Sequence, residues 1–136
     1  MKYALLGVVL ILAAGAGYVL FSQRQAGVGV HAADGSSGRE EMAWREIDDG
    51  ALLVDVRTPA EFAAGHLDGA LNIPLDQIVD RKAELGSDLD RSIVLYCRTG
   101  HRSGLAEKAL EGVGFTHLLN GGGYKDLVKV RDDMKD

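Results

Sequence analysis

The chain has 136 residues, of which 46% are hydrophobic and 26% are charged, a composition typical of a globular protein. Its length accommodates one domain and a short appendage. The formal net charge of −5 argues against a nucleic-acid partner, and the single cysteine excludes an internal disulfide.

An uncharged stretch of eighteen residues, 4–21, follows a short flank at residues 1–3. As a helix it would be about 27 Å long, close to the ~30 Å hydrocarbon thickness of a membrane, so we expect a transmembrane anchor. The alternative is a cleavable signal peptide, because Lys2 gives a basic start and residues 30–32 resemble a cleavage site. The stretch exceeds the usual apolar region of about 7–15 residues and ends well before residue 30, which favours the anchor.

The charges that flank this stretch predict its orientation. Lys2 and the amino terminus precede it and only Arg24 follows closely, which places the domain of a single-pass protein on the periplasmic side of the cell membrane. Residues 22–38 are rich in glycine, serine and alanine without a sustained period, which is typical of a flexible tether. A folded domain at residues 39–131 and a polar tail at residues 132–136 complete the chain.

Short apolar segments alternate with helical patterns throughout the expected domain. We expect strands at residues 51–56, 70–73, 92–96 and 116–119. We expect helices at residues 59–62, 75–85, 105–113 and 124–130, and a short helix or turn around Trp44 that covers the core. This alternation predicts an α/β fold, with a small parallel sheet flanked by helices on both faces.

The strand at residues 92–96 ends at Cys97, shortly before a helical pattern begins. Unpaired amides and the dipole at a helix N-terminus favour an anion and lower a thiol pKa from its usual value of about 8.5. The neighbours Arg98, His101 and Arg102 would act in the same direction, and successive loop amides can hold a second anion beside the sulfur. The pattern indicates a nucleophilic thiolate with an anionic substrate, and the alternative is that Cys97 is a small buried hydrophobe.

The domain around this basic loop is acidic. Two basic residues and one acidic residue precede residue 39, which leaves 13 basic and 19 acidic residues and a net charge of −6. This distribution favours a small anion bound at one position. One cysteine and four scattered histidines lack metal-ligand spacing, so we expect no metal and no cofactor.

Asp55 and Arg57 end the strand at residues 51–56. In a parallel sheet they would lie at the same edge as Cys97, where we interpret them as supporting residues for the loop. An ion pair that fixes the next turn, such as Arg57 with Glu61, is an equally good interpretation.

Three shorter patterns complete the candidate site. Thr58 and Pro59 predict a capped helix start, and His66 is interpreted as a satisfied buried histidine rather than a general base. Three glycines in an expected turn at residues 120–123 favour close backbone approach or positive φ beside the loop. They do not match the phosphate-loop pattern G-x-x-x-x-G-K-[ST].

Four segments carry a family resemblance. They are L-L-V-D-V-R-T-P-A-E-F at residues 52–62, G-H-L-D-G-A-L-N-I-P at 65–74, Y-C-R-T-G-H-R-S at 96–103 and N-G-G-G-Y-K-D at 120–126. In this order they resemble the motifs of the single-domain rhodaneses, the thiosulfate-type sulfurtransferases, and above all the small exported phage-shock rhodaneses. The resemblance covers residues 40–131, although Tyr124 stands near a position where the family often carries a tryptophan.

The resemblance implies a rhodanese-like fold and ping-pong sulfur transfer. Thiosulfate or a similar donor would dock on the substrate-binding loop residues Arg98, Thr99, Gly100, His101 and Arg102. The Cys97 thiolate would attack the outer sulfur as sulfite leaves, without a general base if the thiolate is already populated. Cyanide or a thiol, such as that of a redox protein, would then accept the sulfur from the Cys97 persulfide.

Two alternatives use the same loop differently. Cysteine-loop phosphatases and arsenate reductases resemble C-x-x-x-x-x-R, with five intervening residues, whereas four residues separate Cys97 from Arg102. The other alternative is a membrane-tethered module that carries or senses a persulfide without turnover.

Overall fold

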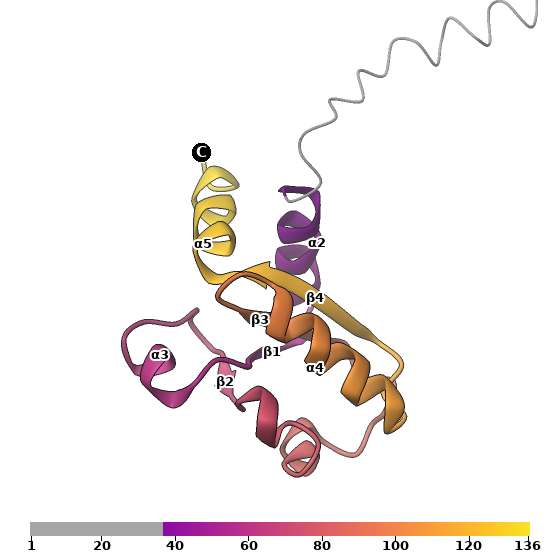
Figure 1. Ribbon diagram of the computed structural model, residues 1–136. Helices are drawn as coiled ribbons and strands as arrows, with labels where there is room; N and C mark the ends of the chain where they lie inside the picture. The colour runs from indigo at the N-terminus through magenta and orange to yellow at the C-terminus, as the bar shows by residue number, and fades with distance from the viewer. Residues whose placement is uncertain (1–36) are drawn as a thin grey trace, which may run out of the picture. The chain divides into compact units, whose positions relative to one another are not determined.

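A computed structural model describes residues 37–136 of the chain (Figure 1). The expected anchor at residues 4–21 and residues 22–36 of the expected tether lie outside this range. Residues 37 and 38, also assigned to the tether, instead begin the first described helix. Within residues 37–136, no helix combines the length and apolarity needed to cross a membrane.

Helices and strands alternate along the described chain, as the sequence predicts. In order, they are α2 (Ser37–Asp48), β1 (Leu52–Asp55), α3 (Pro59–Ala63), β2 (Leu71–Asn72), the 3-10 helices η1 (Leu75–Gln77) and η2 (Lys82–Leu85), β3 (Ile93–Cys97), α4 (His101–Gly112), β4 (Leu118–Gly123) and α5 (Tyr124–Asp133).

The four strands form one parallel sheet in the order β2-β1-β3-β4, which confirms the predicted α/β fold. In this sheet Asp55 of β1 is in register with Asn72 of β2 and Tyr96 of β3. Because all strands run the same way, their carboxyl ends share one edge. Cys97 at the end of β3 and Arg57 just after β1 therefore come to the same side of the molecule.

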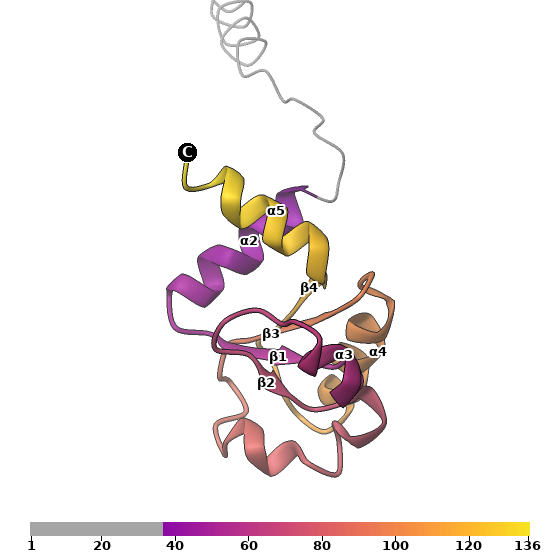
Figure 2. The ribbon, with the colours of Figure 1, turned by 90° about the vertical axis from the view of Figure 1, so that its left-hand side faces the viewer.

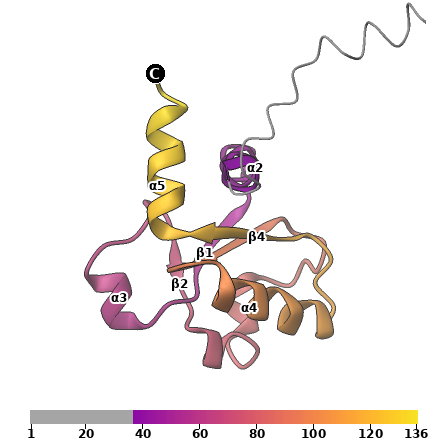
Figure 3. The same cartoon turned by 45° about the horizontal axis from the view of Figure 1, so that its top comes forward.

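Helices cover both faces of the sheet. Figures 1 and 3 show α4 on one face, with α2 and α5 side by side on the other, and Figure 2 gives the orthogonal view. Side chains of β3 alternate between the two cores: Leu95 and Cys97 pack on the α4 side, whereas Val94 and Tyr96 pack with α2 and α5. Trp44 of α2 is buried in the second core and its Nε1 donates to the carbonyl of Leu127 at 2.8 Å, which confirms its predicted covering role.

The fourth strand differs from its prediction. β4 begins at Leu118 and continues through Gly123, so the expected turn at residues 120–123 is instead strand. Its register against β3 shifts between Leu95 and Tyr96, because Gly121 is bulged out of the pairing. Gly122 has a φ of 94° and lies against Glu40 of α2, which confirms the predicted close approach and positive φ.

The segment at residues 75–85 forms two short 3-10 helices rather than the one helix expected. Its apolar residues Leu75, Ile78 and Leu85 do pack on the α4 side of the sheet. Apolar spacing of three residues suits a 3-10 helix as well as an α-helix, so periodicity alone did not separate the two. At the carboxyl end, α5 extends to Asp133 and includes the first residues of the expected polar tail.

Candidate active site

Cys97 lies at the end of β3, and α4 begins four residues later at His101. Gly100 precedes the helix with a φ of 94°, in the left-handed region that favours glycine, and this conformation turns its amide back towards the sulfur. The Gly100 N–H donates to Cys97 Sγ at 3.0 Å. Cys97 itself is 0% exposed, so the thiol lies beneath the loop.

The surroundings of Cys97 lower the pKa of its thiol. Burial opposes ionisation, but hydrogen bonds from the Ser103 hydroxyl and from the amides of Ser103, Thr99 and Gly100 together outweigh it. Hydrogen bonds are therefore the main cause of the lowering. Of the cationic neighbours that the sequence suggested, Arg102 has a charge interaction with Cys97, which favours the thiolate. Arg98 and His101 have exposed side chains at the outside of the loop.

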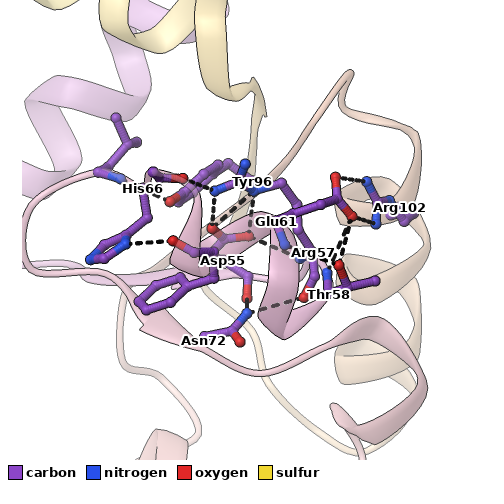
Figure 4. Close-up of polar contacts among 11 residues, drawn as sticks. Asp55, Arg57, Thr58, Glu61, His66, Asn72, Tyr96 and Arg102 are labelled. Atoms are coloured by element: carbon purple, nitrogen blue, oxygen red, sulfur yellow. Dashed lines mark hydrogen bonds and ion pairs between the residues drawn. The ribbon is translucent and has the colours of Figure 1, made fainter.

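Arg102 pairs with Glu61 of α3 in a two-bond ion pair, with Nη1–Oε1 at 2.7 Å and Nη2–Oε2 at 2.9 Å (Figure 4). The hydrogen bond from Arg102 holds the pKa of Glu61 at about 2; burial opposes this shift and Thr58 assists it. The suggested pairing of Arg57 with Glu61 is therefore wrong. The Arg102 guanidinium, expected to bind substrate, is instead engaged by a carboxylate from another element.

Asp55 and Arg57 pair with each other at the end of β1, and both are buried. Arg57 Nε lies 3.0 Å from each Asp55 carboxylate oxygen, and Arg57 Nη2 also donates to the Gly65 carbonyl at 2.7 Å (Figure 4). The Arg57 guanidinium stands over the Tyr124 ring at 4.6 Å. No hydrogen bond joins either residue to Cys97, so within the described residues their support consists of fixing the chain that follows β1.

Asn120 of β4 and Ser103 of α4 also border the cysteine loop, which comprises residues 97–102. Neither was singled out as a site residue from the sequence. Ser103 Oγ donates to Asn120 Oδ1 at 2.7 Å and lies 3.5 Å from Cys97 Sγ. Asn120 Nδ2 donates to the Gly100 carbonyl at 2.9 Å. Their positions in the sequence could have indicated a role at the site, because Ser103 is the last residue of the motif that contains Cys97 and Asn120 is the first residue of the glycine motif.

The start of α3 follows the prediction, because Thr58 and Glu61 form a reciprocal capping box with Pro59 in the first turn. His66 differs from it, because this side chain is exposed rather than buried. Its ring stacks on Phe62 with centroids 3.6 Å apart, and its Nδ1 lies 2.8 Å from the Phe62 carbonyl oxygen. These local contacts stabilise the turn after α3. Among residues 37–136, no three His, Cys, Asp or Glu side chains gather in an arrangement that could hold a metal ion.

The chain matches the family model described as "Rhodanese-like domain" over residues 40–129. The thiosulfate sulfurtransferase PspE of Escherichia coli is 39% identical over 74 residues, which cover 54% of this chain and 71% of that protein. A sulfurtransferase of Allochromatium vinosum is 42% identical over 82 residues, which cover 60% of this chain and 75% of that one.

Solved structures agree with this match. One described as a rhodanese with anions from E. coli superposes with a TM-score of 0.54 at 38% identity, over 56% of this chain and 89% of that structure. With the parallel sheet and the cysteine loop at its carboxyl edge, these similarities show that the chain belongs to the rhodanese family and is a rhodanese-like transferase.

Proposed function

We propose that the chain is a sulfurtransferase that moves sulfane sulfur from thiosulfate or a similar donor to a thiophilic acceptor through a persulfide on Cys97. The observation that carries this proposal is the Cys97 sulfur at the end of β3, accepting the Gly100 amide at 3.0 Å with a lowered thiol pKa. A thiolate is the reactive form of cysteine, and the loop favours it without a histidine base. The names of the E. coli and A. vinosum relatives support the same reaction class.

In the first half-reaction the Cys97 thiolate attacks the outer sulfur of thiosulfate. The S–S bond of the donor breaks and its electron pair leaves with sulfite, while the outer sulfur becomes the terminal atom of the Cys97 persulfide. In the second half-reaction cyanide or a thiol attacks that terminal sulfur. The product departs as thiocyanate or a new persulfide, and the Cys97 thiolate is restored.

The backbone and the side chains of the loop have different roles in binding the donor. The amides of residues 98–102 bind the donor, and the exposed Arg98 and His101 side chains offset its negative charge. Arg102 contributes its backbone, because Glu61 occupies its guanidinium.

We also propose that residues 4–21 anchor this domain in the cell membrane, with the domain on the periplasmic side. The support is the uncharged length of the stretch and the position of Lys2 before it. Alkaline extraction of membranes tests the anchor, and protease added to spheroplasts tests the side. Release at high pH contradicts the anchor, and protection of the domain from external protease contradicts the orientation.

Steady-state formation of thiocyanate from thiosulfate and cyanide tests the proposed reaction. A ping-pong mechanism predicts parallel double-reciprocal plots when one substrate is varied at several concentrations of the other. A single burst equal to the enzyme present, without turnover, would indicate a persulfide carrier. Hydrolysis of an aryl phosphate without thiocyanate formation would indicate a cysteine-loop phosphatase.

A further inference from the structure

The Ser103 hydroxyl stands between two acceptors in the first turn of α4. Its oxygen lies 2.7 Å from Asn120 Oδ1 and 3.5 Å from Cys97 Sγ, and Ser103 is 0% exposed. A hydroxyl has one proton, so it makes a full hydrogen bond to only one of these acceptors at a time. Because the hydroxyl is fully buried, the stronger of the two acceptors takes the proton.

The orientation of the Asn120 amide is fixed by two backbone groups. Its Nδ2 donates to the Gly100 carbonyl at 2.9 Å, and its Oδ1 accepts from the Gly122 N–H at 3.0 Å. A flipped amide would set oxygen against a carbonyl and NH₂ against an N–H. The atom that faces Ser103 is therefore an acceptor, already supplied with one donor by Gly122.

We propose that Asn120 is a positioning residue that acts through Ser103, holding the hydroxyl proton while Cys97 is a neutral thiol and releasing it to the sulfur when the sulfur is negatively charged. A thiolate is a stronger acceptor than a neutral amide, so the proton turns towards Sγ on ionisation. Asn120 Oδ1 keeps the Gly122 N–H and is not left unpaired. When the Ser103 hydroxyl turns from Asn120 to Cys97, each of these three side chains therefore keeps a hydrogen-bond partner.

This arrangement would assist both halves of the proposed reaction. It rests on that proposal only because it takes Cys97 as the nucleophile. In the first half, the hydroxyl proton stabilises the attacking thiolate. In the second, Cys97 Sγ is the leaving group and regains negative charge as the acceptor takes the outer sulfur. The same proton then stabilises that charge.

The pH dependence of Cys97 alkylation by iodoacetamide tests the proposal in the full-length chain in detergent. Ser103→Ala removes the proton and is expected to raise the thiol pKa by about one unit, a tenfold fall in thiolate at low pH. Ser103→Thr retains a hydroxyl and should restore most of this shift. Asn120→Asp presents a carboxylate that competes for the proton, so it should also raise the thiol pKa.

The decisive comparison repeats the Asn120 substitution in the Ser103→Ala background. If Asn120 acts through the hydroxyl, the Asn120→Asp shift should fall to less than half its size in that background. Equal shifts in the two backgrounds would overturn the proposal, since Asn120 would then act by charge or by loop structure alone.

If Asn120→Asp does not fold, Asn120→Ala replaces it in both backgrounds. With the hydroxyl present, loss of the competing acceptor should lower the thiol pKa more than the same substitution does in the Ser103→Ala background. Equal shifts again contradict the proposal. Alkylation needs no sulfur donor, so this result is independent of whether the protein forms a persulfide.

Discussion

The guanidinium of Arg102 and the carboxylate of Glu61 lie face to face, with their two hydrogen bonds at 2.7 and 2.9 Å. Arg102 belongs to the first turn of α4 and Glu61 to the first turn of α3, where it also completes the capping box with Thr58. One carboxylate therefore joins the cysteine loop to the segment after β1.

Glu61→Gln should impair the reaction of the cysteine loop while lowering the unfolding free energy of the domain only slightly. Both side chains are about one-third exposed, so solvent screening limits the loss to about 0.5 kcal/mol of unfolding free energy. Persulfide formation should slow several-fold in a stopped-flow assay with thiosulfate. Glu84→Gln, which breaks the Arg81–Glu84 pair outside the site, is the matched control and should leave the rate unchanged. Equal rates in all three proteins would refute a positioning role for the pair.

The same pair predicts an acid-sensitive contribution to stability. The Glu61 pKa is about 2 in the folded protein against an ordinary value of 4.5, so the folded state favours the ionised form. The contribution is complete above about pH 4.5 and is lost as the pH falls towards 2. The unfolding free energies of wild type and Glu61→Gln, measured with urea across this pH range, should therefore converge as the pH falls. A difference in unfolding free energy between the two proteins that grows as the pH falls would contradict this explanation.

Cys97 should react as a thiolate at lower pH than an ordinary cysteine. Its folded pKa is lowered, chiefly because the hydrogen bonds of Ser103 and the loop amides outweigh the effect of burial. The alkylation midpoint should lie below the ~8.5 of a free thiol and return to that value in the urea-unfolded chain. Identical midpoints in the folded and unfolded chain would show that the loop does not favour the thiolate.

Asp55→Ala should be among the most destabilising substitutions of a polar residue in this domain. It leaves the Arg57 guanidinium buried without its carboxylate partner, at a cost of about 3–5 kcal/mol. Asp48→Ala breaks the exposed Arg131–Asp48 pair and provides the matched control, for which we expect a much smaller change. Urea unfolding measures both. Similar losses in the two variants would mean that burial does not set the importance of the Asp55–Arg57 pair.

Gly100→Ala should impair the site as well as the fold. At a φ of 94°, alanine costs about 1–2 kcal/mol, and its Cβ would lie 3.3 Å from Gly122 Cα. Gly50→Ala shares a positive φ of 102° but meets nothing within 4 Å, so it carries the backbone cost without the crowding. Only Gly100→Ala should slow persulfide formation. A loss of rate in Gly50→Ala of the same size would attribute the effect to general destabilisation.

Local pattern predicted much of this fold. The apolar run before Cys97 and the capping residues at Thr58 depend on neighbours close in the chain, and both appear in the structure as expected. The helix predicted at residues 105–113 also forms, although α4 begins four residues earlier, at His101. The parallel sheet followed from the alternation of such segments. The prediction of one helix at residues 75–85 was wrong, because three-residue apolar spacing fits a 3-10 helix as well as an α-helix.

Pairings between distant segments could not be predicted in the same way. Arg57 has carboxylates at Asp55 and Glu61 within a few residues, and only the folded chain shows that Asp55 takes it while Glu61 turns to Arg102. Likewise, Asn120 lies in register with Leu95 of β3, and only the folded chain shows that its side chain contacts Ser103 of α4, 17 residues away in the sequence. The sequence pattern predicts which residues lie near the cysteine loop. Which of them pair with one another depends on the tertiary structure.

The mass of the intact protein after incubation with thiosulfate shows directly whether Cys97 carries a persulfide. We expect a gain of one sulfur, about 32 Da, as for a covalent intermediate, and no gain in Cys97→Ser. Cyanide should remove the added mass and release one thiocyanate for each protein that carried it. An unchanged mass in wild type, or an equal gain in Cys97→Ser, would contradict a Cys97 persulfide and with it the proposed sulfurtransferase mechanism.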